Sequence, residues 1–149
     1  MSSPLPISDA AIVAAMGGPE AIGADSVGTL DVIRAVERGF DARAVAHLSE
    51  RFPLARADLC AALAIGTRSL AHRKRTGRLR PSESERLWRA ARVLCRAEEV
   101  LGDPERASRW VVRPALGLGW YRPIDLVRWE IGGQAVEQLL GRIEYGIVV

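Results

Sequence analysis

Apolar residues recur every three or four positions along most of this chain, and proline, glycine or capping residues interrupt the pattern at short intervals. That spacing places apolar side chains on one face of an α-helix, whereas a half-buried strand would alternate every second residue. Ala, Leu and Arg are abundant and runs of β-branched residues are few, which also favours helix. The 149 residues can bury one core or two small ones. The sequence therefore predicts an all-α protein of several short helices.

Two short helices are predicted before residue 53. Thr29 can cap the first, which Gly39 ends, and Asp41 can cap the second, which Pro53 stops. Each helix carries one apolar stripe that we expect to be buried. The stripes are Leu30, Ile33 and Val36 in the first helix and Val45, Leu48 and Phe52 in the second.

A helix-turn-helix motif is predicted in the middle of the chain. Leu59 and Leu63 share one helix face, residues 64–66 form a short break, and Thr67 can cap the next helix. Ala64 stands where a turn glycine is commonest, so the match to the motif is imperfect.

The second helix of this motif is strongly basic. Residues 66–95 carry nine basic and two acidic side chains, a net charge of +7, whereas the whole chain has a net charge of only +3. A local field of one sign indicates a polyanionic partner, most often nucleic acid. A solvated helix face is the plainer alternative, but such faces usually mix signs. The predicted DNA-binding residues are Thr67, Arg68, Ser69, His72, Arg73, Lys74, Arg75, Arg78 and Arg80.

These residues have different expected roles, because the second helix of such a motif lies in the major groove. Residues 67–69 stand at the helix amino end, where free N–H groups favour phosphate or base-edge contacts. His72 and Arg73 are the expected base readers, since Arg can bind guanine through two hydrogen bonds. The expected phosphate contacts are Lys74, Arg75, Arg78 and Arg80.

Four further helices are predicted after residue 80. A capping box at Ser82 and Glu85 opens a long helix, and Asp103 caps the next one, from Pro104 to about Val112. A short helix starts at Pro123 and is broken by Gly132 and Gly133. The last helix runs from Gln134 to about Tyr145, and its apolar face consists of Val136, Leu139, Leu140 and Ile143.

Several functional classes are disfavoured. Residues 1–26 are rich in Ser, Pro, Gly and Ala, which predicts a mobile tail with a short helix at residues 9–16, and they lack the basic start of a signal peptide. No apolar stretch approaches the roughly 20 residues of a membrane span. Cys60 and Cys95 lie among apolar neighbours, so we expect buried thiols rather than a disulfide. These features favour a cytoplasmic protein without a membrane partner.

Catalysis is also not expected. The two histidines, His47 and His72, have no nucleophile or carboxylate at a telling spacing, and no Cys/His cluster has metal-ligand spacing. "GLG" at residues 117–119 lacks the glycine spacing of a dinucleotide site. We therefore predict no catalytic residue, no metal site and no cofactor.

Two segments resemble the antitoxins of the Xre/MbcA/ParS family, which are partners of RES-domain toxins. The first is "RSLAHRKRTGRLRPSESERLWRAARVLCRAEEVLGDPERASRWV". The second and more specific one is "RPIDLVRWEIGGQAVEQLLGRIEYGIVV", with a short "RPIDL" helix, a glycine break and a terminal "GRIEYG" helix. The resemblance begins at about Val27 and covers roughly four fifths of the chain.

The resemblance implies a helix-turn-helix domain at residues 27–92 and a toxin-binding domain at residues 93–149. It also implies a homodimer that binds its own promoter and neutralises, by contact, a toxin that degrades NAD or uses it to ADP-ribosylate a target. The expected toxin-binding residues are Arg142, Glu144, Tyr145, Gly146, Ile147, Val148 and Val149.

Some alternatives remain open at the level of sequence. The apolar end at residues 147–149 fits a partner surface or a tail folded back on its own core. Trp120, Tyr121 and Arg122 stand where the family often has a glycine, a basic residue and a Thr cap, and the two aromatics are expected to pack on the toxin or on a dimer partner. A stand-alone dimeric regulator without a toxin, or a toxin inhibitor that no longer binds DNA, would fit the same residues.

Overall fold

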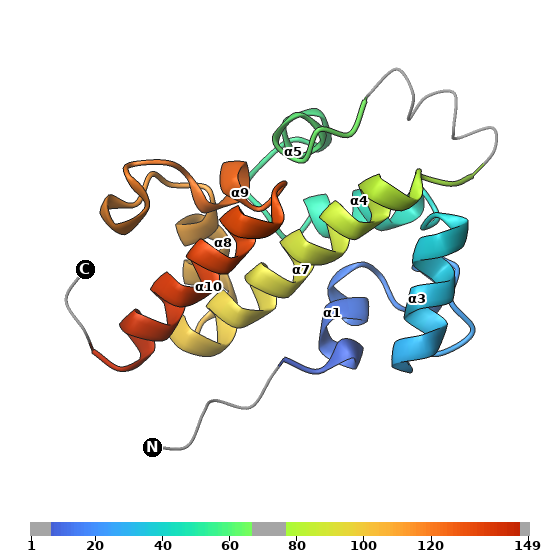
Figure 1. Ribbon diagram of the computed structural model, residues 1–149, viewed down its shortest axis with the longest axis horizontal. Helices are drawn as coiled ribbons and strands as arrows, with labels where there is room; N and C mark the ends of the chain where they lie inside the picture. Colours follow the sequence, from blue (N-terminus) through green and yellow to red (C-terminus); the bar gives the residue numbers. More distant parts are fainter. Residues whose placement is uncertain (1–6, 67–76, 147–149) are drawn as a thin grey trace.

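One long helix, α7 (Pro81–Leu101), runs through the middle of the molecule (Figure 1). The structure is a computed structural model that describes residues 7–66 and 77–146. Helices from the first half of the chain, α1 and α3, pack on α7, and so do α8 and α10 from the second half. The two halves of the chain therefore meet on one shared helix.

The other elements are short. Before α7 lie α1 (Asp9–Ala15), α2 (Pro19–Ile22), α3 (Thr29–Arg38), α4 (Arg43–Ser49) and α5 (Arg56–Ala62). After it lie α8 (Pro104–Val111), the 3-10 turn η1 (Leu116–Leu118), α9 (Pro123–Leu126) and α10 (Glu130–Glu144). Apart from an isolated antiparallel bridge between Asp41 and Arg78, the described part of the chain is helical or irregular, which confirms the all-α prediction.

A single apolar core extends through both halves. Leu48 and Leu59 come from the first half, Leu94 from α7 and Leu140 from α10, and all four are fully buried in one continuous cluster. Burying a side chain of this kind contributes roughly 1.5–3 kcal/mol. The predicted stripe of the second helix, Val45, Leu48 and Phe52, is buried as expected.

A buried arginine joins α7 to the last two helices. The Arg89 guanidinium donates from Nη1 to the carbonyls of Val127 and Arg128, at 3.0 and 3.2 Å, and lies 3.3 Å from the Glu130 carboxylate. Only 8% of the Arg89 side chain is exposed. Because a buried charge must be paired and hydrogen-bonded, this side chain holds the end of α9 and the start of α10 in one position on α7.

The segment expected to be a mobile tail is folded from its first described residues. α1 and α2 bury Ile12, Val13 and Ile22, and the Cys95 thiol donates to the Ala11 carbonyl at 3.6 Å. The interpretation of residues 1–26 as a mobile tail is therefore wrong from residue 7 onward, although its short helix is confirmed by α1. Gly17, Gly18 and Pro19 form the turn between α1 and α2, which composition alone does not distinguish from disorder.

Helix α3 buries a different face from the one the sequence predicts. Val32 and Ala35 are buried, while Leu30 and Ile33 are 66% and 46% exposed. Both sets recur at helical spacing, so periodicity alone could not choose between them. The predicted Thr29 cap is also wrong: Gly28 is the N-cap, and the Thr29 hydroxyl instead donates to the Asp9 carboxylate at 2.8 Å.

Helix α7 is capped at Arg80, two residues before the predicted cap Ser82. Pro81 occupies its first position, and the Glu83 carboxylate accepts from the Arg80 N–H at 2.9 Å. The box at Ser82 and Glu85 is therefore wrong, because proline fits the first helical turn without losing a hydrogen bond. By contrast, Asp103 accepts from the Glu105 N–H at 3.2 Å and caps α8 as predicted.

The two adjacent glycines lie inside α10 instead of breaking it. A Cβ at Gly132 would stand 1.9 Å from the Leu126 carbonyl oxygen, and one at Gly133 would stand 2.7 Å from the Arg89 Cδ. The helix therefore begins at Glu130, and its glycines allow α9 and α7 to approach its backbone closely.

Both cysteines are free and buried, as predicted. Burial raises the pKa of the Cys95 thiol to about 11, with a smaller contribution from the Glu98 carboxylate. Within residues 7–66 and 77–146, no helix is long and apolar enough to cross a membrane.

Gly132→Ala should destabilise the protein by roughly 1–3 kcal/mol or more, because the added methyl group collides with backbone that cannot move cheaply. Gly141→Ala in the same helix is the matched control, since a Cβ there has nothing within 4 Å. The control should be neutral or gain up to about 1 kcal/mol of helix propensity. Urea unfolding followed by circular dichroism measures both, and equal stability of the two variants would contradict the close approach.

Candidate functional site

Most of the predicted DNA-binding residues lie outside the described part of the chain. They are Thr67, Arg68, Ser69, His72, Arg73, Lys74 and Arg75. Arg78 and Arg80 are described, and both are exposed. We call residues 66–80 the basic segment; its two described ends show how it is attached to the fold.

Each end of the basic segment is attached to the core by a buried apolar residue. Before the segment, Ile65 is 2% exposed and its N–H donates to the Cys60 carbonyl at 2.8 Å. Towards its end, Leu79 is 3% exposed and its N–H donates to the Phe40 carbonyl at 2.8 Å. Arg78 forms the bridge to Asp41 beside it. The described ends of the basic segment are therefore both fixed to the core.

The turn after α5 has the geometry that the sequence pattern indicates. Ala64 has φ +55°, in the left-handed region that favours glycine. The alanine that replaces the usual turn glycine therefore adopts the conformation for which the motif prefers glycine. Sequence reasoning missed the residue that fastens this turn. Arg86 on α7 donates from Nε to the Leu63 carbonyl at 2.7 Å and from Nη2 to the Ala64 carbonyl at 3.1 Å.

Arg86 is held in a crowded cationic setting. Burial lowers the pKa of its guanidinium from the ordinary value, and the nearby charges of Arg89 and Arg128 lower it further. Arginine remains protonated at neutral pH, so both hydrogen bonds to the turn are charge-assisted. No local motif marks Arg86, because its partners lie more than 20 residues earlier in the chain.

The predicted toxin-binding residues are at the end of α10 and just beyond it. Arg142 is exposed, Tyr145 is 51% exposed, and Gly146 has φ +72°. The Glu144 carboxylate forms an ion pair with Arg96 of α7, so its charge is balanced within the chain. Ile147, Val148 and Val149 lie outside the described residues.

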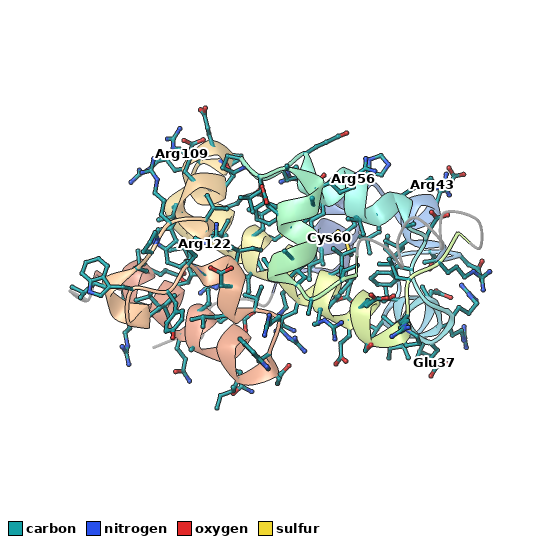
Figure 2. All side chains as sticks on the ribbon, turned by 90° about the horizontal axis from the view of Figure 1, so that it is seen from above. Glu37, Arg43, Arg56, Cys60, Arg109 and Arg122 are labelled. Carbon is teal, nitrogen blue, oxygen red and sulfur yellow. The ribbon has the colours of Figure 1, made fainter. Side chains whose placement is uncertain are left out.

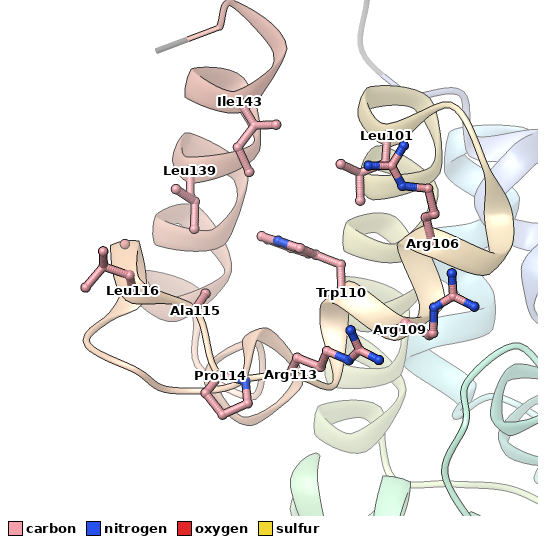
Figure 3. A pocket seen from close by; sticks show the side chains of 11 residues that line it. Leu101, Arg106, Arg109, Trp110, Arg113, Pro114, Ala115, Leu116, Leu139 and Ile143 are labelled. Atoms are coloured by element: carbon pink, nitrogen blue, oxygen red, sulfur yellow. The ribbon is translucent and has the colours of Figure 1, made fainter. Parts of the chain in front are cut away.

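A cleft of about 410 Å³ opens beside this end of α10, between α8, η1 and α10 (Figure 3). The Trp110 side chain projects from α8 towards α10, where Leu139 and Ile143 face it. Three arginines of α8 and the following turn, Arg106, Arg109 and Arg113, line the same cleft. The cleft therefore combines apolar walls with a cationic edge.

Large apolar side chains are exposed on the loop that follows α8. The Ala115 carbonyl accepts from the Trp120 N–H at 2.9 Å, and the Ala115 N–H donates to the Tyr121 carbonyl at 3.1 Å, which closes residues 115–121 into a tight loop. Trp120 has φ +65° and its side chain is 65% exposed. A tryptophan in the left-handed region costs roughly 1–2 kcal/mol, and Trp120 leaves most of its indole in solvent, which indicates a role outside the fold.

Further apolar residues in the same half of the chain as Trp120 are exposed. Sequence reasoning noted Trp120 and Tyr121, which is 61% exposed, but it missed Leu116, Trp129 and Ile131 at 59%, 50% and 78%. Ile131 could have been found, because it lies off the face that Val136 and Leu140 define on the same helix. We call Leu116, Trp120, Tyr121, Trp129 and Ile131 the aromatic surface.

A second cleft, of about 680 Å³, lies between α5 and α9 and is lined by part of the aromatic surface. Figure 2 labels Cys60 of α5 and Arg122 at the start of α9. Tyr121 and Trp129 line it, and the Arg128 guanidinium lies 4.0 Å from the Trp129 ring centroid. Arg122 donates to both oxygens of Asp125, at 2.7 and 2.9 Å, so it braces α9 instead of supplying the side-chain cap of the family pattern.

These surfaces suit macromolecular partners better than small-molecule chemistry. Among the residues that the structure describes, no three His, Cys, Asp or Glu side chains are grouped to hold a metal ion. Exposed aromatic residues and arginines are the types enriched at protein interfaces.

Comparison with known proteins gives two family matches. Residues 31–92 match the antitoxin Xre-like helix-turn-helix domain, and residues 96–146 match the antitoxin Xre/MbcA/ParS C-terminal toxin-binding domain. The two matches meet within α7.

Curated relatives agree with these matches. The chain is 33% identical over 118 residues to the antitoxin Xre of Yersinia enterocolitica, which covers 78% of this chain and 80% of the relative. It is 40% identical over 73 residues to the antitoxin Xre of Photorhabdus laumondii, covering 48% and 49%. It is 33% identical over 64 residues to the antitoxin Xre of Pseudomonas putida, covering 43% and 40%.

Arg86→Met should lower the free energy of unfolding by about 1–3 kcal/mol, because it keeps the apolar stem but removes both charged hydrogen bonds to the turn. Arg113→Met, at an exposed position, is the matched control and should stay within about 0.5 kcal/mol of the wild type. Chemical unfolding in urea measures both. A wild-type value for Arg86→Met would mean that solvent replaces these hydrogen bonds without cost.

Proposed function

Because the chain belongs to the Xre/MbcA/ParS antitoxin family, we propose that it neutralises an NAD-consuming RES-domain toxin and, as a cytoplasmic homodimer, represses its own promoter. Membership of the family by itself establishes the general function. The protein is an Xre-type antitoxin, with a C-terminal domain that binds a toxin and a helix-turn-helix domain that binds DNA, and it is not an enzyme.

The observation that supports toxin contact most directly is the aromatic surface on the matched toxin-binding domain. Trp120 is held at a strained φ and remains 65% exposed, although burial of an indole would stabilise the isolated chain. Such strain is retained where a surface serves a partner. Large rigid side chains of this kind are the usual anchors of protein interfaces.

The predicted contact residues Arg142, Glu144, Tyr145 and Gly146 lie at the end of α10 and just beyond it, and Ile147, Val148 and Val149 are proposed to take part although they lie outside the described residues. Ile143 and Leu139 line the cleft that Trp110 enters, so the end of α10 is continuous with that cleft. Arg106 and Arg113 on the cleft edge suit acidic groups of a toxin. We propose that this end of the antitoxin covers the NAD-binding cleft of the toxin and excludes its substrate sterically.

DNA binding is proposed to use the basic segment. The buried anchors Ile65 and Leu79 set its position, and Arg86 holds the turn that precedes it. Thr67, Arg68 and Ser69 would approach the backbone or base edges, His72 and Arg73 the bases, and Lys74, Arg75, Arg78 and Arg80 the phosphates. Occupation of the promoter in this way would block transcription of the operon.

The proposed function is tested by co-purifying the chain with the product of the neighbouring gene and assaying NAD consumption. A tight complex in which NAD turnover stops supports the proposal. A toxin that binds this chain but consumes no NAD by itself would overturn the RES assignment while leaving the antitoxin in place. DNA binding is assayed separately by titrating the upstream region.

Arg73→Ala should weaken binding to the operator by roughly 1–3 kcal/mol and relax base preference at one position. Arg78→Ala, at an exposed described residue, should weaken all DNA about equally and flatten the salt dependence. Fluorescence anisotropy with operator and scrambled duplexes at several salt concentrations separates these effects. Loss of only the specific complex in Arg78→Ala would assign this residue to the bases instead.

Trp120→Gly should stabilise the free protein by up to about 1 kcal/mol, because glycine adopts φ +65° without strain. The same change should weaken toxin binding by at least about 1 kcal/mol through loss of the indole. Ala64→Gly is the matched control, since it relieves the other left-handed residue without touching the aromatic surface. Thermal unfolding and calorimetric titration with toxin measure both quantities, and unchanged toxin affinity in Trp120→Gly would rule out the indole as an anchor.

A further inference from the structure

Helix α3 presents an apolar face that the fold leaves uncovered. Leu30 and Ile33, one turn apart, are 66% and 46% exposed, and Val27 just before the helix is 38% exposed. Val32 and Ala35, on the other side of the helix, are buried in the core. It lies at the end of the molecule away from α8 and α10, the helices of the toxin-binding half (Figure 1). Contiguous apolar exposure of this kind marks an interaction surface.

A groove of about 300 Å³ runs beside these residues. Its apolar walls are Val32, Ile33, Val36 and Trp88. The Trp88 ring packs against the Phe40 ring, with 6.5 Å between the ring centroids and 58° between the ring planes. Glu37 and Glu85 lie at its edge. The surface therefore contains both projecting apolar side chains and a rigid apolar recess.

We infer that a second copy of this chain docks on the outer face of α3, with Leu30 of each copy seated in the Val36–Trp88 groove of the other. This inference rests on the homodimer of the proposed function and names the surface that forms it. A twofold interface buries the same patch of both copies. Each patch must therefore hold a projecting side chain and, beside it, a recess that fits the same side chain of the other copy. The α3 face meets this requirement by itself.

The charges on α3 fit the same arrangement. Arg34 is exposed, with 62% of its side chain accessible, and Glu37 lies one turn later. Arg34 contacts Asp31 of its own helix at 3.4 Å, whereas Glu37 has no ion-pair partner within residues 7–66 and 77–146. Figure 2 shows Glu37 at the edge of the molecule. Two antiparallel copies of α3 bring Arg34 of one within side-chain reach of Glu37 of the other.

The position of this surface also connects it to DNA binding. α3 ends at Arg38 and is capped by Gly39, and the carbonyl of the next residue, Phe40, accepts the hydrogen bond that holds Leu79 near the end of the basic segment. If two copies of α3 pack about a twofold axis, the short connection through Phe40 and Leu79 would fix the distance between the two basic segments. Dimeric helix-turn-helix proteins require such a fixed separation to bind two half-sites.

The test uses the purified full chain without toxin or DNA, and measures its mass by sedimentation equilibrium over a range of concentrations. The variants are Leu30→Glu and Ile33→Glu, which change exposed residues and so preserve the fold, with circular dichroism as the check. Ile131→Glu is the matched control, because it places the same charge on a 78% exposed isoleucine of α10. We expect a wild-type dimer, a dimer dissociation constant at least tenfold higher in both α3 variants, and no change in the control.

A charge exchange gives a second, independent measurement. Arg34→Glu and Glu37→Arg should each weaken the dimer, and the double variant should restore it, because the intermolecular pair is then reversed. A dimer that none of the α3 variants weakens would overturn this surface while the homodimer of the proposed function stands. A wild type that stays monomeric would overturn both, and toxin neutralisation, which is assayed separately, would be unaffected.

Discussion

The burial of α7 is the constraint on which the rest of the structure depends. The two family matches end and begin within this helix, yet α1 and α3 pack on it from one half of the chain and α8 and α10 from the other. Neither half has a separate core, since Leu87 and Leu94 belong to the same cluster as residues from both ends. The helix also provides Arg86 to the turn before the basic segment and Arg89 to the junction of α9 and α10. One helix therefore contacts both the matched helix-turn-helix domain and the matched toxin-binding domain.

The protein departs from ordinary folding preferences in places that face solvent. Ala64 and Trp120 are the non-glycine residues with positive φ in the described part of the chain, one in the turn before the basic segment and the other on the aromatic surface. Leu30 and Ile33 are exposed although the same helix offers a buried face. Sequences usually satisfy local and global preferences together, so violations of this kind concentrate where partners bind. These three places coincide with the surfaces proposed for DNA, for the toxin and for a second copy of the chain.

The fold separates the surfaces proposed for these partners. The hydrogen bond between Phe40 and Leu79 follows α3 directly in the chain, and α8 and α10 of the toxin-binding half lie at the other end of the molecule (Figure 1). The second cleft is the exception, because α5 from the DNA-binding half lines it together with Tyr121 and Trp129. A partner that occupied that cleft would contact the helix immediately before the turn, so toxin and DNA binding need not be independent.

The sequence alone determined the features that depend on neighbours in the chain. The helices around Leu48 and Leu59, the end of a helix at Gly39 and the cap at Asp103 follow from apolar spacing and capping chemistry. The "RPIDL" and "GRIEYG" segments indicated the family. Only the tertiary structure decided which face of α3 is buried, since two stripes share the helical period and the choice depends on what lies opposite. It also decided that Gly132 and Gly133 admit Leu126 and Arg89 instead of ending a helix, and that residues 9–22 fold on the core. These outcomes depend on contacts between residues far apart in the chain, which periodicity and composition do not encode.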